Sequence, residues 1–131
     1  MPRKKARTLT AFELEIMRFI WRHEETTVPD LQRALEATGR IVALPTIRTM
    51  LGILEQKGYV TRRTGRRRHV YRATVSAEDG KRRILKDVVE RAFDGSAMDL
   101  VAALVNAAMI SRRDLEKAKR LIQQHDKGAV K

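Results

Sequence analysis

The 131-residue chain carries 28 lysines and arginines against 16 aspartates and glutamates, a formal net charge of +12. This excess predicts a polyanionic partner, most often nucleic acid and less often an anionic membrane surface. The absence of cysteine excludes disulfides and thiolate metal sites, and no apolar run approaches the roughly 18 residues of a membrane span. We therefore expect a cytoplasmic protein without stable membrane association.

The positive charge is concentrated in the first part of the chain. Residues 1–75 hold 16 basic and 7 acidic residues, a net +9, whereas residues 76–131 hold 12 and 9, a net +3. The surface that binds the polyanion is therefore expected within residues 1–75.

The chain is expected to open with a flexible basic arm over residues 1–8, which has four basic residues and no apolar pattern. A first helix then begins at a capping box, in which Thr10 and Glu13 satisfy each other's backbone amides. The helix is predicted to run to about residue 23. Its buried stripe consists of Phe12, Ile16, Met17 and Ile20.

A short strand at residues 26–28 and a second helix at residues 29–38 follow, the latter ended by Gly39. A third helix is predicted over residues 45–57, with Gly58 at its C-terminal end. On a 3.6-residue repeat, one face of this third helix is apolar and suits a buried core. That face consists of Ile47, Met50, Leu51 and Leu54.

The opposite face of the third helix carries mostly small or hydrogen-bonding residues, which can enter a DNA major groove. We expect the DNA-reading residues there to be Pro45, Thr46, Arg48, Thr49 and Gly52. Arg48 is the best candidate for a bidentate contact to guanine, and the threonines can meet a thymine methyl group or a phosphate.

Two short alternating strands, residues 59–62 and 69–72, are predicted to form a hairpin after this helix. The tip around Gly65 holds five arginines in seven residues. Such a tip can straddle a phosphate backbone or enter a minor groove, whereas the plainer interpretation is a solvated loop. Its position directly after the third helix favours DNA contact by Arg62, Arg63, Arg66, Arg67 and Arg68.

Helix, short strand, helix, turn, helix and two-stranded wing form the order of a winged helix-turn-helix domain. We therefore predict a mainly α protein with such a DNA-binding domain over residues 9–75, followed by a helical dimerisation lobe over residues 76–131. The lobe is expected to contain three helices, which begin at capping boxes led by Ser76, Ser96 and Ser111.

The middle helix of the lobe, residues 97–106, is almost entirely apolar. Three short helices totalling about 50 residues cannot bury such a helix well alone, so we expect two copies of the chain to associate. The alternative is that these helices pack back on their own winged domain. The dimerisation residues are predicted to be Val88, Leu100, Val101, Leu104, Leu115, Leu121 and Ile122.

The sequence holds no constellation that predicts catalysis. Its three histidines, His23, His69 and His125, lie in three different predicted elements without metal-ligand spacing. The chain also has no phosphate-cradling glycine motif, no nucleophile elbow and no carboxylate pair singled out by spacing. We expect a protein that is not an enzyme and needs no cofactor or metal.

Three stretches carry a resemblance to a known family. They are Thr46-Ile-Arg-Thr-Met-Leu-Gly-Ile-Leu-Glu-Gln-Lys-Gly58, the opening helix Leu9-Thr-Ala-Phe-Glu-Leu-Glu-Ile-Met-Arg-Phe-Ile-Trp21, and Phe93-Asp-Gly95 followed by Leu100-Val101. In their order and spacing they resemble the penicillinase-repressor family of winged-helix regulators, which includes the methicillin-resistance and copper-ATPase operon repressors. The resemblance covers about residues 9–122.

The resemblance implies a homodimer, joined through its C-terminal helices, that binds a dyad-symmetric double-stranded DNA operator and blocks transcription. The family's recognition-helix contacts map to Thr46, Arg48 and Thr49. Pro45 stands where relatives often have lysine or another polar residue, and this departure implies a different operator.

The resemblance also implies that a membrane-bound sensor protease relieves repression by cutting the C-terminal lobe. Penicillinase repressors are cut at an Asn-Phe bond, and the matching bond here joins Ala103 to Leu104. The C-terminal cysteine motif of copper-responsive relatives is absent, which argues against copper sensing. Two other functions stay open: a nonspecific architectural nucleic-acid-binding protein, and a ligand-responsive winged-helix regulator.

Overall fold

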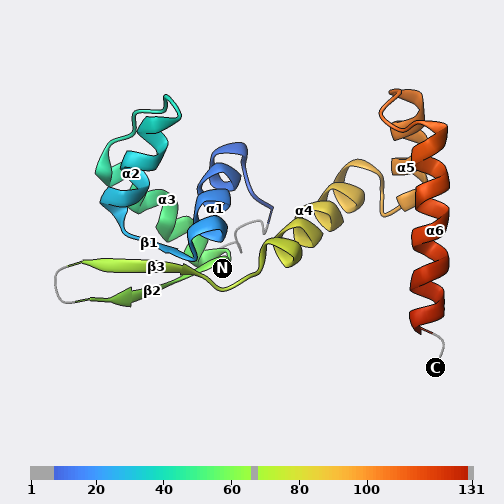
Figure 1. Cartoon of the computed structure of the whole chain (residues 1–131). Coiled ribbons are helices and arrows are strands. Elements are labelled where there is room, and N and C mark those ends of the chain that lie inside the picture. The colour runs from blue at the N-terminus through green and yellow to red at the C-terminus, as the bar shows by residue number, and fades with distance from the viewer. Residues whose placement is uncertain (1–7, 66–67, 130–131) are drawn as a thin grey trace. The chain divides into compact units, whose positions relative to one another are not determined.

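The computed structural model describes residues 8–65 and 68–129 of the chain (Figure 1). Along them the elements run α1 (Ala11–His23), β1 (Glu25–Thr26), α2 (Val28–Ala37), α3 (Leu44–Gln56), β2 (Val60–Thr64), β3 (His69–Ala73), α4 (Ala77–Ala92), α5 (Ala97–Asn106) and α6 (Arg112–Ala129). This order confirms the predicted mainly α fold, a winged helix-turn-helix domain with three helices after its wing.

The core of the winged domain lies where α1, α2 and α3 meet the sheet. Each helix contributes apolar side chains spaced three or four residues apart, so that one stripe of it faces inward. Met50 and Phe12, which belong to these stripes by pattern, are only partly buried at the edge of the core. Burying an aliphatic side chain contributes roughly 1.5–3 kcal/mol, so the stripes determine how the helices pack. The fully buried members are Ile16, Met17, Ile20, Leu31, Ile47, Leu51, Leu54 and Tyr59.

Hydroxyl caps set where α1 and α2 begin. At α1 the Glu13 amide donates to Thr10 Oγ1 (3.2 Å) and the Thr10 amide donates to Glu13 Oε1 (2.9 Å), which is the predicted capping box. At α2 the Asp30 amide donates to Thr27 Oγ1 (3.2 Å). Because Thr27 is the cap, the helix begins at Val28, where the pattern predicts a strand, and β1 is only two residues long.

The three strands form one antiparallel sheet in the order β1-β3-β2 (Figure 1). Strand β1 joins β3 at Glu25 and Thr26 only. The wing proper is the longer pairing of β2 with β3, which ends toward the tip with Thr64 opposite His69. The short strand therefore anchors the base of the wing to the end of α1.

The first turns of α4 pack on the winged domain through the only tryptophan of the chain. The Trp21 Nε1–H donates to the Val75 carbonyl (2.7 Å), and the indole ring lies against the buried Gly80. One turn later, the Arg83 guanidinium lies over the Tyr59 ring, 5.1 Å from its centroid. Burial raises the pKa of the Tyr59 hydroxyl, and the nearby Arg83 charge opposes that rise.

The chain divides into two compact units, Met1–Asp87 and Val88–Lys131. The division falls inside α4, so the turns that pack on Trp21 belong to the winged unit. In the second unit, none of the described side chains of α5 and α6 is buried, and Met98 and Ile122 are 70% and 61% exposed. The apolar faces of α5 and α6 are therefore at most partly covered within the described part of a single chain.

Serine caps begin the three C-terminal helices. At α6 the Asp114 amide donates to Ser111 Oγ (3.1 Å) and the Ser111 amide donates to Asp114 Oδ2 (3.0 Å). The hydrogen bond from the Ser111 amide lowers the pKa of the Asp114 carboxyl. At α4 and α5 the structure shows the serine half of the box, in which Ser76 Oγ and Ser96 Oγ accept from the third helical amide.

The contact between Trp21 and Gly80 predicts that Gly80→Ala destabilises the winged domain. A Cβ at Gly80 would lie 2.5 Å from Cζ2 of Trp21, so the ring must move and strain its bond to Val75. We expect a loss of about 1–3 kcal/mol in the free energy of unfolding, measured by denaturant with Trp21 fluorescence as the probe.

The matched control is Gly52→Ala, because Gly52 is also helical and a Cβ there meets no atom within 4 Å. The better helix propensity of alanine should make this variant more stable by up to about 1 kcal/mol. Equal stabilisation by both substitutions would contradict the packing described for Gly80.

Candidate nucleic-acid interface

Helix α3 buries one face and exposes the other. Ile47, Leu51 and Leu54 have no exposed surface. The five predicted reading residues lie together on the accessible side: four are exposed and the fifth is half-buried. They are Pro45, Thr46, Arg48, Thr49 and Gly52. The structure places them on one helix surface, and their contact with DNA stays a prediction.

The first turn of α3 relies on proline instead of a capping side chain. The N-cap Ala43 makes no side-chain hydrogen bond, and Pro45 in the first turn has no amide hydrogen to satisfy. Thr49 Oγ1 donates to the Pro45 carbonyl (3.0 Å). This bond engages the hydroxyl hydrogen, so Thr49 presents a methyl group and acceptor lone pairs. Such a surface suits a thymine methyl group better than a phosphate.

A buried ion pair holds the other end of α3. Lys57 Nζ lies 2.6 Å from Glu13 Oε1, and the two side chains are only 8% and 4% exposed. The same ammonium donates to the Thr8 carbonyl (2.9 Å), and the same carboxylate accepts the Thr10 amide. The C-terminal end of α3 is therefore tied to the start of α1.

The wing places arginines on both of its faces, because side chains alternate along a strand. Arg62 lies opposite Tyr71, whose ring is buried, and so belongs to the inward face. Arg63 lies on the outward face, where it forms an exposed ion pair with Glu25 (3.7 Å). Exposed pairs of this kind contribute roughly 0–1 kcal/mol, so Arg63 can exchange Glu25 for a phosphate at little cost.

Gly65, at the end of the described part of β2's loop, leaves no room for a side chain. The Gly65 amide donates to the Arg68 carbonyl (2.8 Å), and a Cβ at Gly65 would lie 2.8 Å from that same oxygen. Arg68 at the other side of the turn is exposed. Arg66 and Arg67, which are also predicted to contact DNA, lie outside the described residues.

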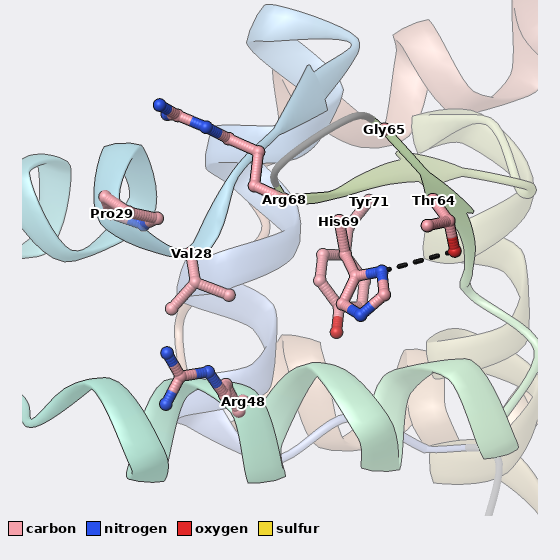
Figure 2. Close-up of a pocket in the computed structure, with 8 residues that line it drawn as sticks. All are labelled: Val28, Pro29, Arg48, Thr64, Gly65, Arg68, His69 and Tyr71. Atoms are coloured by element: carbon pink, nitrogen blue, oxygen red, sulfur yellow. Dashed lines mark hydrogen bonds between the residues drawn. The ribbon is translucent and has the colours of Figure 1, made fainter.

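A groove of about 570 Å³ lies between α3, the start of α2 and the wing (Figure 2). Arg48 lines it from α3, and Arg68 and His69 line it from the wing. The predicted reading helix and the predicted wing therefore meet in one concave basic surface. The lining residues are Val28, Pro29, Arg48, Thr64, Gly65, Arg68, His69 and Tyr71.

Sequence patterns give no DNA-contact signal for Val28 and Pro29, whereas the position of His69 in the wing predicts a contact with phosphate or solvent. Val28 and Pro29 start a helix that precedes the recognition helix, and His69 starts a strand. Only the folded arrangement brings the start of α2 beneath the wing. The one local signal is chemical, because His69 directly follows the arginine run.

The predicted dimerisation residues all lie in the second unit or at its boundary, in α4, α5 and α6. Those on α4 and α6 are exposed: Val88, Leu115, Leu121 and Ile122. Those on α5 are half-buried: Leu100, Val101 and Leu104. The bond from Ala103 to Leu104 lies inside α5.

The described residues offer no metal site, since no group of three or more His, Cys, Asp or Glu side chains within them could hold an ion. Over the same ranges, no helix combines the length and the apolar character needed to cross a membrane.

Known proteins resemble this chain in sequence and in fold. The family model described as penicillinase repressor matches residues 9–124. The solution structure of the DNA-binding domain of the repressor BlaI is 30% identical, with 59% of this chain and 93% of that chain covered and a TM-score of 0.50. The monomeric form of BlaI from Bacillus licheniformis, solved in complex with the blaP half-operator, has the same identity and coverage and a TM-score of 0.48.

A complex structure of hsRosR-S1 is similar over most of both chains. It is 23% identical, covers 96% of this chain and 98% of that chain, and has a TM-score of 0.51, which is a likeness of fold alone. No curated protein sequence matches the chain.

The buried ion pair predicts that Lys57→Met destabilises the domain strongly. The substitution leaves the Glu13 carboxylate buried without its cation, which should cost about 3–5 kcal/mol of unfolding free energy in denaturant titrations. The double variant Glu13→Gln/Lys57→Met removes both charges and keeps an amide oxygen for the Thr10 cap, so it should recover most of that loss.

The control for a general effect of losing a lysine is Lys119→Met. Lys119 pairs with Glu116 at 3.6 Å on the surface of α6, with both side chains more than half exposed. This variant should change stability by less than about 0.5 kcal/mol. A loss at Lys57 no larger than the loss at Lys119 would show that the ion pair does not hold α3.

Proposed function

Because the chain belongs to the penicillinase repressor family and is a DNA-binding transcriptional regulator, we propose that it represses transcription as a homodimer bound to a dyad-symmetric operator. Members of this family are repressors and not enzymes, so the function lies in binding alone. The observation that carries the proposal is the exposed face of α3 beside the arginine wing, with Arg48 and Arg68 lining one groove.

Two different tasks fall to α3 and the wing in this proposal. Arg48 offers the planar fork that binds guanine O6 and N7, and Thr49 offers a methyl group to thymine. The wing arginines bind phosphates, which adds affinity but little sequence information. Pro45 brings no donor to the first turn of α3, so the operator should differ from those of relatives with lysine there.

The apolar surface of the second unit supports the proposed dimer. Leu121 and Ile122 on α6 are 66% and 61% exposed, and α5 has no buried side chain although most of its residues are apolar. A soluble chain rarely leaves such surface in water. Two copies joined there would present two recognition helices to half-sites about one helical turn apart, or a multiple of it.

The proposal also includes relief of repression by proteolysis of the second unit. The bond from Ala103 to Leu104 lies within α5, so a membrane-bound sensor protease could cut it only after α5 unwinds locally. Cutting there would divide the helix that supplies Leu100, Val101 and Leu104 to the dimer. Mass spectrometry of the chain after induction in its host would show fragments ending at residue 103; fragments ending elsewhere would reject this bond.

Two other functions give different measurable behaviour. A nonspecific architectural protein would prefer the chain's own promoter region over random duplex by well under roughly a thousandfold. A ligand-responsive regulator would show a rise in melting temperature with one of a panel of small metabolites, because a ligand that binds the native state stabilises it.

The proposal predicts different effects for the two arginines of the groove. Arg48→Ala should cost about 1–3 kcal/mol on the operator and relax the preference at one base pair. Arg68→Ala should weaken operator and random DNA alike and reduce the salt slope by about one. Fluorescence anisotropy with both duplexes at several salt concentrations measures these changes. Equal losses on both duplexes for Arg48→Ala would reject its role in base reading.

The proposed dimer is tested by sedimentation of the full chain, which should have twice the 15.0 kDa mass. Leu121→Asp together with Ile122→Asp should give monomers, because a carboxylate buried in the interface would lack a partner. Ile41→Asp is the matched control, since Ile41 is 87% exposed but lies in the turn before α3. A monomeric parent chain at micromolar concentration would overturn the dimer.

A further inference from the structure

We propose that the groove between α3 and the wing seats one backbone phosphate of the bound DNA, and that His69 binds this phosphate in a proton-dependent way. DNA affinity would then fall as pH rises. This inference rests on the DNA-binding role proposed above and adds a regulation to it, because the chain would hold its DNA more tightly in an acidified cell.

The charges that line the groove suit an anion. Arg68 and His69 line it from the wing and are basic, and none of the lining residues is acidic. Arg48 adds a third positive charge from α3, while its guanidinium is assigned to a base above. A cleft lined by charges of one sign strengthens the local electrostatic potential. The chemistry of the lining therefore favours a phosphate over a cation or an uncharged ligand.

Two acidic groups on the neighbouring elements, Asp30 and Glu25, have partners in the structure. Asp30 on α2 forms an ion pair with Arg33. Glu25 on β1 pairs with Arg63 on the outward face of the sheet, the face away from His69. Strand β2 adds Arg62 to the inward face, and α3 adds Arg48. The charges around His69 are thus mainly positive until a phosphate arrives.

His69 is held by a strand and not by the loop. It pairs with Thr64 across the wing, and the Thr64 hydroxyl lies 3.4 Å from Nδ1 of the imidazole. Figure 2 shows this nitrogen turned toward Thr64, with the second ring nitrogen on the side of α3. A neutral imidazole offers one N–H, whereas the imidazolium offers two and a positive charge. The second nitrogen can therefore donate to a phosphate while Thr64 accepts from the first.

The sign of the pH effect follows from linkage. A phosphate favours the charged imidazolium, so DNA binding draws a proton onto the ring when the ring is neutral in the free protein. Affinity is therefore greatest at acid pH and declines as pH rises. Since the contact is to the backbone, the effect should appear on any duplex, whatever its sequence.

The other two histidines provide internal controls. His23 lies at the end of α1, with its ring 4.3 Å from that of Phe19. His125 is exposed on α6. Neither lines the groove, so neither should contribute to the effect.

The experiment measures the affinity of the full chain for a random-sequence duplex between about pH 6 and about pH 8 at constant chloride concentration, a range in which histidine changes charge. Affinity should fall by about fivefold across this range, the size expected for one charge-assisted contact to phosphate. His69→Gln should abolish the fall, because glutamine keeps a neutral donor and has no proton to gain. His69→Arg should keep the high affinity at both ends of the range, and the double variant His23→Gln/His125→Gln should behave as the parent.

Each outcome supports or contradicts the proposed phosphate contact of His69. A pH dependence that survives His69→Gln, or that disappears in the double variant, overturns the role of His69. If the parent chain binds DNA with no pH dependence, the role of His69 is wrong but the proposed regulator is not affected. If the chain shows no preference for its operator, the proposed repressor is wrong, but this test on random DNA is not affected. If millimolar inorganic phosphate removes the dependence and sulfate of equal ionic strength does not, the groove takes a free phosphate ion and the assignment to DNA is wrong.

Discussion

The position of α3 depends on the buried ion pair between Glu13 and Lys57. One carboxylate completes the cap of α1 and also neutralises the ammonium at the end of α3, and that ammonium in turn binds the Thr8 carbonyl. Each group is buried, so each requires the other. Together with the apolar stripe of α3, this pairing leaves the helix little freedom to rotate, and the side that carries Arg48 is held toward solvent.

A rigid α3 matters because the wing is a separate element that must act with it. The wing is anchored at its base by β1, which follows directly from α1, and Tyr71 of β3 is buried in the common core. Arg48 and Arg68 thereby line one groove although they come from a helix and a turn. Charges on one rigid surface lose less conformational freedom on binding than charges on loose segments, and this favours DNA affinity.

The contacts of α4 connect this rigid part with the rest of the chain. Trp21 binds the Val75 carbonyl and lies against Gly80, and Arg83 lies over Tyr59, so the first turns of α4 are part of the winged unit. The later turns belong to the second unit, whose apolar side chains are left exposed. The helix α4 thus contributes residues to both units.

Local sequence was sufficient for the elements and their order. The helix that starts at the Thr10 cap, the largely apolar α5 over Ala97–Asn106 and the two-faced α3 were predictable, because caps and stripes involve residues only three or four apart. The strand before α2 was predicted wrongly in part: Val28 follows the pattern of a strand, but the Thr27 cap includes it in the helix.

Long-range partners were not predictable in the same way, and the tertiary structure alone decided them. Glu13 looks like a capping residue, and nothing near it in the chain indicates Lys57, 44 positions away. Trp21 likewise contacts Val75 across 54 positions, and the basic residues of the groove come from α3 and the wing. Each of these contacts depends on the angles at which buried stripes pack, and those angles arise from shape and volume in the core, which a one-dimensional pattern does not encode.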